Sequence, residues 1–591
     1  MRFFFASTVT VLSLGAPALA KLYQSVIDLP GTKYDYVIVG GGTAGSVLAS
    51  RLTEDNSTKV LVIEAGLDNA GMMSTIVPWL GIQNLGGLAD WNFTSTPQVG
   101  MKNRTLHLSR GYVMGGSSSI NHMTYNRGAN DVWNAFAKMS DDEGWAWNNM
   151  EKYYRRNSRL VPPADGHNTT GMVMPEAHGN GPIQVSLNGF PQEVEPVIVS
   201  IAKDLGGRFR FNEDVNAGDM IGISYMQSTI GHGERCSAAT AYLVPALGRH
   251  NLDVVIHTKA TKVFASNPNR GKKIKIDTVE VAHESNGPRY TFQAKKEIIM
   301  STGVFGTPHL LMLSGIGPKE QLEKFNIPVL VDSPQVGKNL ADHPLLSVYY
   351  TVNSTNTFDD VLRNKTLANE LLKQWNETRT GLMVNPVAGN SVAFLKNPPG
   401  FLDGYDPSTG PGSANTEMIF YNGYGTLGPL PQPPTGNFMS VIIGVVSPTS
   451  RGTVTLNSTD PFNYPNIDPA LYTTDYDMKS MIQVMKDADY LLHHRFMDQY
   501  IREPMFKFAN DSEMEDYARS NSVTINHCVG TARMGPGGTD GGAVDSHLHV
   551  KGVEGLRVVD ASIFPIIPEH HTQATVYLAA ERLADLIKQG R

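Results

Sequence analysis

The sequence predicts a mixed α/β fold built around a Rossmann-like dinucleotide-binding unit, and three segments lead to this prediction. Residues 36–64 read as strand, glycine-rich turn, helix, strand and acid. Residues 291–318 show an apolar strand-like run followed by a helix-like run, and residues 556–588 repeat that order at the C-terminus. Because these segments lie far apart in the chain, we expect one domain to be assembled from discontinuous pieces.

The first segment contains every part of a dinucleotide-binding unit. An apolar run at 36–39 precedes Gly40-Gly41-Gly42-Thr43-Ala44-Gly45, a helix should follow to Leu52, and a strand at 60–63 ends at Glu64. Gly40 allows the tight turn, Gly42 lets the backbone approach a pyrophosphate, and Gly45 lets the helix pack on the strand. Glu64 follows Gly40 by 24 residues, where an acid can bind the hydroxyls of an adenosine ribose. The alternative, a glycine-rich turn without a nucleotide, is disfavoured because strand, helix, strand and acid occur in this order.

The other two segments have a strand followed by a helix. In the middle segment, a strand at 297–300 leads through a Ser-Thr-Gly turn to a helix at 308–313. At the C-terminus, a strand at 556–560 leads to a helix from about Gln573 to Lys588, whose apolar residues recur at helical spacing. Longer irregular stretches separate these segments and are the best place for a substrate domain.

The N-terminus has the pattern of a secretory signal. Residues 1–20 begin with Arg2, continue with an apolar stretch and end in Ala18-Leu19-Ala20, a small-residue cleavage site. No later stretch offers about 18 uninterrupted apolar residues, so no membrane span is expected. We therefore expect a secreted protein, with the cell wall or the vacuole as alternative destinations.

Because a secreted chain can be N-glycosylated, its nine Asn-x-Ser/Thr triplets are candidate glycosylation sites, and we expect them to lie in surface loops. They begin at Asn56, Asn92, Asn103, Asn168, Asn353, Asn364, Asn376, Asn457 and Asn510.

Composition excludes several classes of protein. A chain of 591 residues with only two cysteines, Cys236 and Cys528, is not a disulfide scaffold. One bridge between them is an option, but two separate buried thiols are favoured. The net charge of −7 and the lack of a long basic run make nucleic acid an unexpected partner.

Four blocks of the sequence share a pattern with one known protein family. They are the glycine-rich unit above, residues 110–128, residues 303–317, and a C-terminal set formed by 527–535, 544–545, 560–562 and 571–573. Shorter matches occur at 90–93, 178–182 and 336–343. Together these blocks resemble the glucose-methanol-choline (GMC) oxidoreductases, a flavoprotein family. Within the family, the chain is most similar to the fungal branch of aryl-alcohol oxidases and sugar dehydrogenases.

The resemblance implies FAD as the cofactor and no metal. Some relatives attach FAD covalently through a histidine directly before the Asn of the second block. Ile120 occupies that place here, so noncovalent FAD is predicted. The residues expected to bind FAD are Gly40, Gly42, Thr43, Ala44, Gly45, Glu64, Ala65, Trp91, Arg110, Gly115, Gly116, Ser117, Asn121, His122, Met123, Thr124, Val263, Asp560, Ala561, Thr572 and Gln573.

The resemblance also implies two domains. We expect the FAD-binding domain to be assembled from residues 34–159, 222–330 and 521–591. The substrate-binding domain, which should contain an antiparallel sheet, is expected to comprise residues 160–221 and 331–520.

Two histidines are the expected catalytic residues. The family carries one histidine before Val-Gly-Thr and a second histidine or an asparagine eleven residues after the aspartate of Asp-x-Ser, which here are His527 and His571. Alcohol oxidation removes a hydroxyl proton and a hydride, and a largely neutral imidazole is a suitable base for that proton. We expect His527 to be the base and His571 its partner, although the roles could be exchanged or shared.

Other candidates carry less weight. His547 and His549 alternate along an expected strand like metal ligands, but two histidines without further ligand spacing rarely make a zinc site, so a structural role is favoured. His570 either reaches the pocket or lies at the surface, and His122 could contact flavin or substrate. Phe420, Tyr421 and Tyr424 are candidate pocket residues by composition only, with a place in the core as the alternative.

The resulting functional hypothesis is an oxidoreductase that transfers a hydride from a primary alcohol, aromatic or allylic alcohols being favoured, to N5 of the flavin. The product would be the aldehyde or a further oxidation product. A sugar dehydrogenase or oxidase acting on glucose or another pyranose is the alternative, and an FAD-containing hydroxynitrile lyase is less favoured. Oxygen or a quinone would be the electron acceptor, and the protein would be a monomer or a homodimer.

Overall fold

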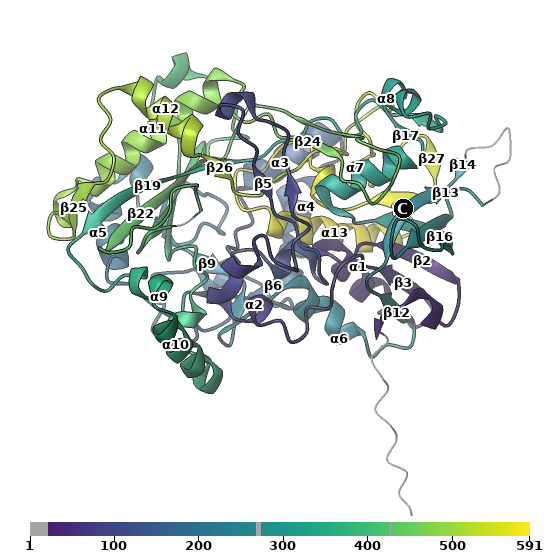
Figure 1. The fold of residues 1–591 in the computed structure, drawn as a ribbon, viewed down its shortest axis with the longest axis horizontal. Helices are drawn as coiled ribbons and strands as arrows, with labels where there is room; N and C mark the ends of the chain where they lie inside the picture. Colours follow the sequence, from purple (N-terminus) through teal and green to yellow (C-terminus); the bar gives the residue numbers. More distant parts are fainter. Residues whose placement is uncertain (1–21, 267–273, 426) are drawn as a thin grey trace, which may run out of the picture.

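Two sheets on opposite halves of the long axis organise the chain (Figure 1). The structure, a computed structural model, describes residues 22–266, 274–425 and 427–591. The signal sequence expected at 1–20 therefore lies outside the described residues. The following paragraphs call the half that contains the glycine-rich turn the nucleotide half and the other the antiparallel half.

The sheet of the nucleotide half joins the three segments that the sequence singled out. Its eight strands run in the order β1-β12-β3-β2-β16-β15-β13, with β28 also paired to β16. The strands β1, β12, β3, β2, β16 and β28 pair in parallel, whereas β15 and β13 continue the sheet antiparallel. Their bounds are Leu22–Tyr23 (β1), Leu252–Val255 (β12), Val60–Ile63 (β3), Lys33–Val39 (β2), Tyr290–Met300 (β16), Thr278–Ala282 (β15), Lys259–Phe264 (β13) and Leu556–Val558 (β28).

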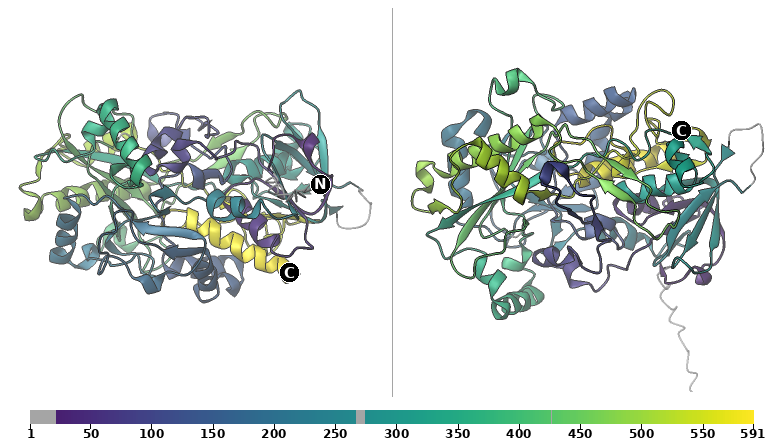
Figure 2. Two further views of the ribbon diagram at one scale, coloured as in Figure 1. Left: turned by 90° about the horizontal axis from the view of Figure 1, so that it is seen from below. Right: turned by 45° about the horizontal axis from the view of Figure 1, so that its top comes forward.

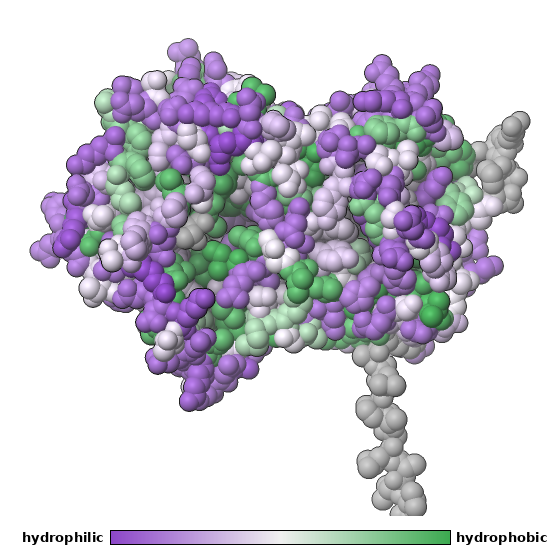
Figure 3. Space-filling model, viewed as in Figure 1, coloured by the Kyte–Doolittle hydropathy of each residue, from purple (hydrophilic) through white to green (hydrophobic). Residues whose placement is uncertain are grey.

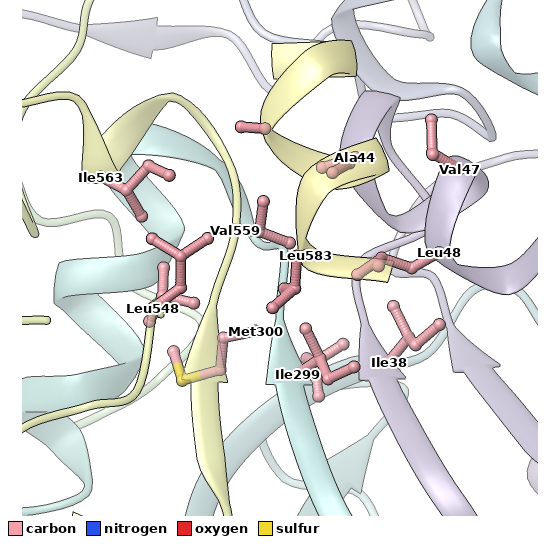
Figure 4. Packing of buried hydrophobic residues seen from close by; sticks show 14 of the residues in the cluster. Ile38, Ala44, Val47, Leu48, Ile299, Met300, Leu548, Val559, Ile563 and Leu583 are labelled. Carbon is pink, nitrogen blue, oxygen red and sulfur yellow. The ribbon is translucent and has the colours of Figure 1, made fainter. Parts of the chain in front are cut away.

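Helices α1 (Thr43–Leu52) and α13 (Gln573–Lys588) pack against each other beside this sheet, although more than 500 residues separate them. Figure 4 shows apolar side chains from both helices and from β2 and β16 meeting in one core. Strands β2 and β3 are buried over consecutive apolar residues, which is typical of parallel strands covered on both faces. The prediction of a domain assembled from discontinuous segments is thereby confirmed.

The sheet of the antiparallel half has seven strands in the order β25-β19-β22-β21-β20-β8, with β26 also paired to β19. All of its pairings are antiparallel, as expected for the substrate-binding part. The strands span Ile501–Pro504 (β25), Pro344–Val352 (β19), Phe438–Val445 (β22), Thr416–Tyr421 (β21), Ser391–Leu395 (β20), Gly222–Tyr225 (β8) and Val523–Thr524 (β26).

Two of these strands lie in residue ranges that were predicted to belong to the other domain. Residues 222–330 and 521–591 were assigned to the FAD-binding domain, but β8 and β26 lie inside those ranges and pair with β20 and β19. Both strands are short, and their pairing depends on partners far away in the chain. The division into two domains stays a prediction, and the strand pairing groups Gly222–Tyr225 and Val523–Thr524 with the antiparallel sheet.

The two faces of the antiparallel sheet have different neighbours because side chains alternate along each strand. One face, which includes Met418 and Phe420, packs against helix α11 (Asp475–Leu492). Tyr421 belongs to a separate core cluster, and Tyr424 stacks on Tyr349 with ring centroids 4.2 Å apart. Phe420, Tyr421 and Tyr424, which composition had suggested for the pocket, are therefore all core residues.

The remaining long helices differ in burial: α7 (Gly303–Leu313) is buried along almost its whole length, whereas α10 (Lys365–Thr378) has only Trp375 buried. Figure 2 shows α13, in yellow, ending at the C-terminus on the side of the nucleotide half. Among the described residues, no helix is both long and apolar enough to cross a membrane. The other helices of at least ten residues are α3 (Asn130–Ser140), α4 (Trp147–Asn157), α5 (Glu195–Leu205), α7 (Gly303–Leu313), α10 (Lys365–Thr378) and α12 (Asp511–Asn521).

All nine asparagines of the glycosylation triplets are exposed. Two of them cap helices: Asn364 at the start of α10 and Asn510 at the start of α12 accept backbone N–H groups through Oδ1. That use leaves the amide nitrogen, the atom to which a glycan would be attached, outside the cap.

Figure 3 shows a surface that is mainly hydrophilic, with apolar patches near the middle of the face. Cys236 and Cys528 are separate buried thiols, as favoured above.

Candidate active site

A cavity of ≈430 Å³ lies between the two halves. One wall is the glycine-rich turn after β2 and the N-terminus of α1, and another is the inner face of the antiparallel sheet. The apolar residues of that second wall come from neighbouring strands and from adjacent loops. They are Leu345, Val387, Ala388, Ile419, Leu427, Ile442, Val523 and Ile525.

The structure brings most of the predicted site residues to this single cavity. Both predicted catalytic residues, His527 and His571, line it. So do eighteen of the predicted FAD-binding residues, which are Gly40, Gly42, Thr43, Ala44, Glu64, Ala65, Trp91, Arg110, Gly116, Ser117, Asn121, His122, Met123, Thr124, Asp560, Ala561, Thr572 and Gln573.

Three predicted FAD-binding residues do not line the cavity. A Cβ on Gly45 would lie 1.9 Å from the carbonyl oxygen of Gly40, so Gly45 serves the close packing of helix on strand. Gly115 has φ +82° and turns the chain before Gly116. Val263 is fully buried, and its N–H donates to Ser314 Oγ. Its assignment needs correction: Ala260, which precedes a register shift in β13, lines the cavity instead.

Two glycine-rich turns meet at the nucleotide end of the cavity. Gly40 has φ +102°, a conformation that favours glycine, and a Cβ on Gly116 would lie only 2.8 Å from the Cα of Gly42. Bare backbone from both turns therefore lines this end, beside the N-terminus of α1. Such an arrangement of N–H groups and helix dipole is suited to a pyrophosphate.

Glu64 supports the same turn from the end of β3. Its two carboxylate oxygens accept the N–H groups of Gly41 and Gly66, each at 2.7 Å. The side chain is buried, and burial raises the pKa of Glu64 to about 7. Each oxygen retains capacity for a further hydrogen bond, so Glu64 can bind ribose hydroxyls while it holds the turn.

The donors and acceptors of the cavity fit FAD. Ser301 Oγ, Gln573 Oε1 and Arg110 Nη2 are buried polar atoms of lining residues that have no hydrogen-bond partner within the protein. Buried polar groups are normally satisfied, so unpartnered atoms here indicate a polar ligand. Together with the two glycine turns, they match a long group with a phosphate centre and polar ends.

A proline in α7 leads to a hydrogen bond between the nucleotide half and the segment that carries His527. Pro308 has no N–H, so it cannot donate to the carbonyl oxygen of Val304 one turn earlier. That oxygen instead accepts the hydroxyl of Thr531 at 2.6 Å. The helix begins at Gly303, five residues before the predicted start, and Asp560 accepts the Gly303 N–H at 2.9 Å.

His527 and His571 face each other in the cavity. Their ring centroids are 4.7 Å apart and the rings are nearly perpendicular, at 77°. His571 directly precedes Thr572, the N-cap of α13, and its N–H donates to Asn126 Oδ1 at 3.0 Å. The N–H of His527 donates to Asp342 Oδ1 at 2.8 Å, so the backbone holds both rings in place.

Each of these rings has one further side-chain partner that the motifs had not indicated. His571 Nε2 lies 2.7 Å from Glu417 Oε1, and His527 Nδ1 lies 3.0 Å from His343 Nδ1. Glu417 lies on β21, two residues from Ile419 and therefore on the same inner face. A sequence signal for Glu417 does exist, because it is a charged residue within an apolar strand.

Burial decides the protonation of His527. The residue is only 9% exposed, and burial, followed by the repulsion that a charge on His571 would add, lowers the pKa of His527 well below its ordinary value. His343, Arg110 and His570 act in the same direction. His527 is therefore neutral over the physiological pH range, and a neutral imidazole has a free lone pair.

The other histidines fall into two groups. His122 lines the cavity, with Nδ1 3.3 Å from the carbonyl oxygen of Pro386, and burial lowers its pKa to about 4. His570 neither lines the cavity nor reaches the surface: it is fully buried and bonds to Thr575 Oγ1 at 2.8 Å. His547 and His549 lie outside the cavity, around a turn rather than along the expected strand.

Comparison with known proteins identifies the family. Sequence models of the N- and C-terminal parts of the GMC oxidoreductases match residues 34–345 and 448–580. Dehydrogenase eriK of Hericium erinaceus is 38% identical over 612 aligned positions, with 100% of both chains covered. Pyranose dehydrogenase 3 of Leucoagaricus meleagris is 32% identical, with 97% of this chain and 96% of that protein covered.

Solved structures agree. A formate oxidase superposes with a TM-score of 0.86 at 30% identity, covering 95% of this chain and 99% of the other. A fungal aryl-alcohol oxidase superposes with a TM-score of 0.79 at 26% identity, with the same coverage. The two glycine turns, the facing histidines and these matches lead to one conclusion: the chain belongs to the GMC oxidoreductase family and is an FAD-dependent oxidoreductase.

Proposed function

We propose that the protein is a secreted enzyme that oxidises a primary alcohol, with aromatic or allylic alcohols favoured, to the aldehyde or a further oxidation product. The observation that carries this proposal is the pair His527 and His571 in a cavity whose far wall is apolar. An apolar wall suits an unsaturated hydrocarbon group, whereas the two imidazoles suit the hydroxyl group at its end.

FAD, when bound, supplies the acceptor for the hydride. The protein supplies the base: the neutral His527 accepts the proton of the substrate hydroxyl as negative charge develops on the oxygen. Glu417 accepts the Nε2–H of His571 and fixes the orientation of that ring against His527. Leu345, Ile419 and Ile442 exclude water from the substrate side, which strengthens these polar interactions.

A sugar dehydrogenase or oxidase is the second candidate. It is supported by the similarity to a pyranose dehydrogenase and by the polar side chain of His122 in the cavity. We also propose that oxygen or a quinone reoxidises the flavin. The protein is further proposed to be secreted and to be a monomer or a homodimer. FAD is proposed to be noncovalent because Ile120, which lines the cavity at the expected attachment position, has only a hydrocarbon side chain.

The substrate class can be tested by anaerobic mixing. Aromatic and allylic primary alcohols should bleach the flavin faster than glucose at equal concentration, because they fit the apolar wall. Oxygen and a quinone dye, supplied side by side, then show which acceptor restores the colour. Faster bleaching by glucose would favour the sugar candidate, and cleavage of a cyanohydrin without bleaching would indicate a lyase.

Acid precipitation tests the mode of FAD attachment. Because Ile120 offers no nucleophilic atom, the denatured protein should release its yellow chromophore into the supernatant. Fluorescence of the supernatant and of the protein band on a denaturing gel measures the partition. A yellow pellet would show that another residue forms a bond with the flavin.

Glu64→Ala should weaken FAD retention more than it alters the redox chemistry of the flavin. The variant loses the acceptor for ribose hydroxyls and also the two bonds that hold the glycine turn. Flavin content after gel filtration is the measurement, and Glu54→Ala, which removes an exposed acid near the end of α1, is the matched control. Full flavin occupancy in Glu64→Ala would contradict the assignment.

The histidine pair can be separated from flavin binding. His527→Ala should keep its flavin but slow reduction by substrate at least ~10²-fold, the usual loss on removing a positioned base. His571→Ala should also slow reduction, and the double variant should lose less than the product of both effects because the imidazoles act as a unit. Stopped-flow absorbance measures the rates, with His549→Ala as the control.

The pH dependence has a definite sign. Only neutral His527 can accept a proton, so the wild-type reduction rate should fall as pH drops through the pKa of His527. Burial lowers that pKa, so the fall should come at a lower pH than for an ordinary histidine. Reduction at the wild-type rate in both single variants, at full FAD occupancy, would remove the pair from the chemistry.

A further inference from the structure

A contact between two ring nitrogens lies behind the catalytic pair. His343 Nδ1 and His527 Nδ1 are 3.0 Å apart, and the rings meet edge to face at 82°. His343 is 1% exposed and does not line the cavity, so neither substrate nor solvent competes for this contact. The distance is that of an N–H···N hydrogen bond between two buried imidazoles.

Such a bond holds one hydrogen, so the two rings must differ. If His527 donates its Nδ1–H, its Nε2 carries the lone pair and can act as a base, and the hydrogen of neutral His343 is on Nε2. If His343 donates instead, His527 carries its hydrogen on Nε2 and can only donate to the substrate. The arrangement around His343 therefore determines whether His527 is a base.

The surroundings of His343 favour the first arrangement. The backbone of Val446 acts on the ring as a hydrogen-bond acceptor and raises the pKa of His343, so the ring should direct a hydrogen toward it. Because Nδ1 faces His527, that hydrogen belongs on Nε2, which makes no other hydrogen bond. The carboxylate of Asp342 is engaged elsewhere, because it accepts the N–H groups of His343 and His527 and the hydroxyl of Thr524.

Burial, followed by the charge around the pair, keeps His343 neutral. Burial lowers the pKa of His343 to about 3, and positive charge on His571 and Arg451 contributes. The groups that act on His527 from its other neighbours, Arg110 and His570, are also basic. Asp342 is the acid nearby, and burial raises its pKa. A neutral His343 retains one lone pair for a hydrogen bond.

We propose that His343 is a positioning residue that accepts the Nδ1–H of His527 and thereby keeps Nε2 of His527 free to take the substrate proton. The inference rests on the proposed function, since it gives His527 the role of base. In the step, the substrate O–H bond breaks and an N–H bond forms at His527 Nε2. The C–H electron pair leaves with its hydrogen as a hydride, which FAD would accept when bound, and His527 becomes an imidazolium whose Nδ1–H bonds His343 more strongly.

The hydrogen positions can be observed by neutron diffraction from deuterium-exchanged crystals of the FAD-loaded protein. The inference expects a deuteron on Nδ1 of His527, none on Nδ1 of His343, and one on Nε2 of His343. A deuteron on Nδ1 of His343 would overturn it, since His527 would then have no lone pair at Nε2. This measurement needs no substrate, so it stands even if the proposed substrates fail to reduce the flavin.

Variants test the consequence for the reaction. His343→Leu removes the acceptor with little change in size, whereas His343→Asn keeps an acceptor near the position of Nδ1. In the leucine variant, anaerobic flavin reduction should slow by about tenfold to a hundredfold, the range expected when a charge-assisted hydrogen bond is lost. The asparagine variant should recover most of that loss.

The pH profile separates positioning from a merely structural role. Without an acceptor, the imidazolium form of His527 is less stable, so the acid limb of the reduction rate should move to lower pH in His343→Leu and return in His343→Asn. His178→Asn, which removes a buried imidazole bonded to Asp214 outside the cavity, is the matched control and should keep the wild-type limb.

Two results would count against the inference. One is a wild-type rate and acid limb in His343→Leu, and the other is equal slowing in both His343 variants with the limb unmoved, which would indicate a structural role only. If no alcohol or sugar bleaches the wild type, the proposed function fails, and the neutron result alone then decides the role of His343.

Discussion

One buried carboxylate, that of Asp342, is the constraint on which the catalytic arrangement depends. It accepts the backbone N–H of its neighbour His343 and of His527, two residues 184 positions apart, and the hydroxyl of Thr524. A buried carboxylate without donors would cost several kcal/mol, so these bonds are not optional. By satisfying Asp342, the chain brings the rings of His343 and His527 to hydrogen-bonding distance, and the ring of His571 then meets His527 from the start of α13.

Burial explains why several imidazoles can lie close together here. His343, His527 and His570 are buried close together, and a protonated form of any one would raise the energy of the others. Burial lowers the pKa of each, so the group is neutral and presents lone pairs rather than charges. The acid Glu417 hydrogen-bonds to His571, which lies beside His527.

Much of this could be predicted from the sequence where the signal is local. The bounds of α1, β3 and α13 follow from glycine positions and apolar periodicity, and family motifs indicated two histidines, His527 and His571, that both line the cavity. What sequence reasoning missed depends on distant partners: Glu417 and His571 are 154 residues apart, and His343 and His527 are 184 apart. Val263 is fully buried away from the cavity, whereas Ala260 of the same strand lines it. The start of α7 was missed because Pro308 lies within the helix, where Thr531 supplies the hydrogen bond that proline leaves open.

The bond between Glu417 and His571 joins the two halves of the molecule. Glu417 belongs to the antiparallel sheet, whereas His571 lies directly before the N-cap of α13, the helix that packs against α1 in the nucleotide half. A slide of one half over the other by a single ångström would lengthen this bond and turn the imidazole away from its partner. The geometry of the histidine pair therefore depends on the relative position of the two halves. Substitutions where the halves contact each other far from the cavity can then change the turnover rate.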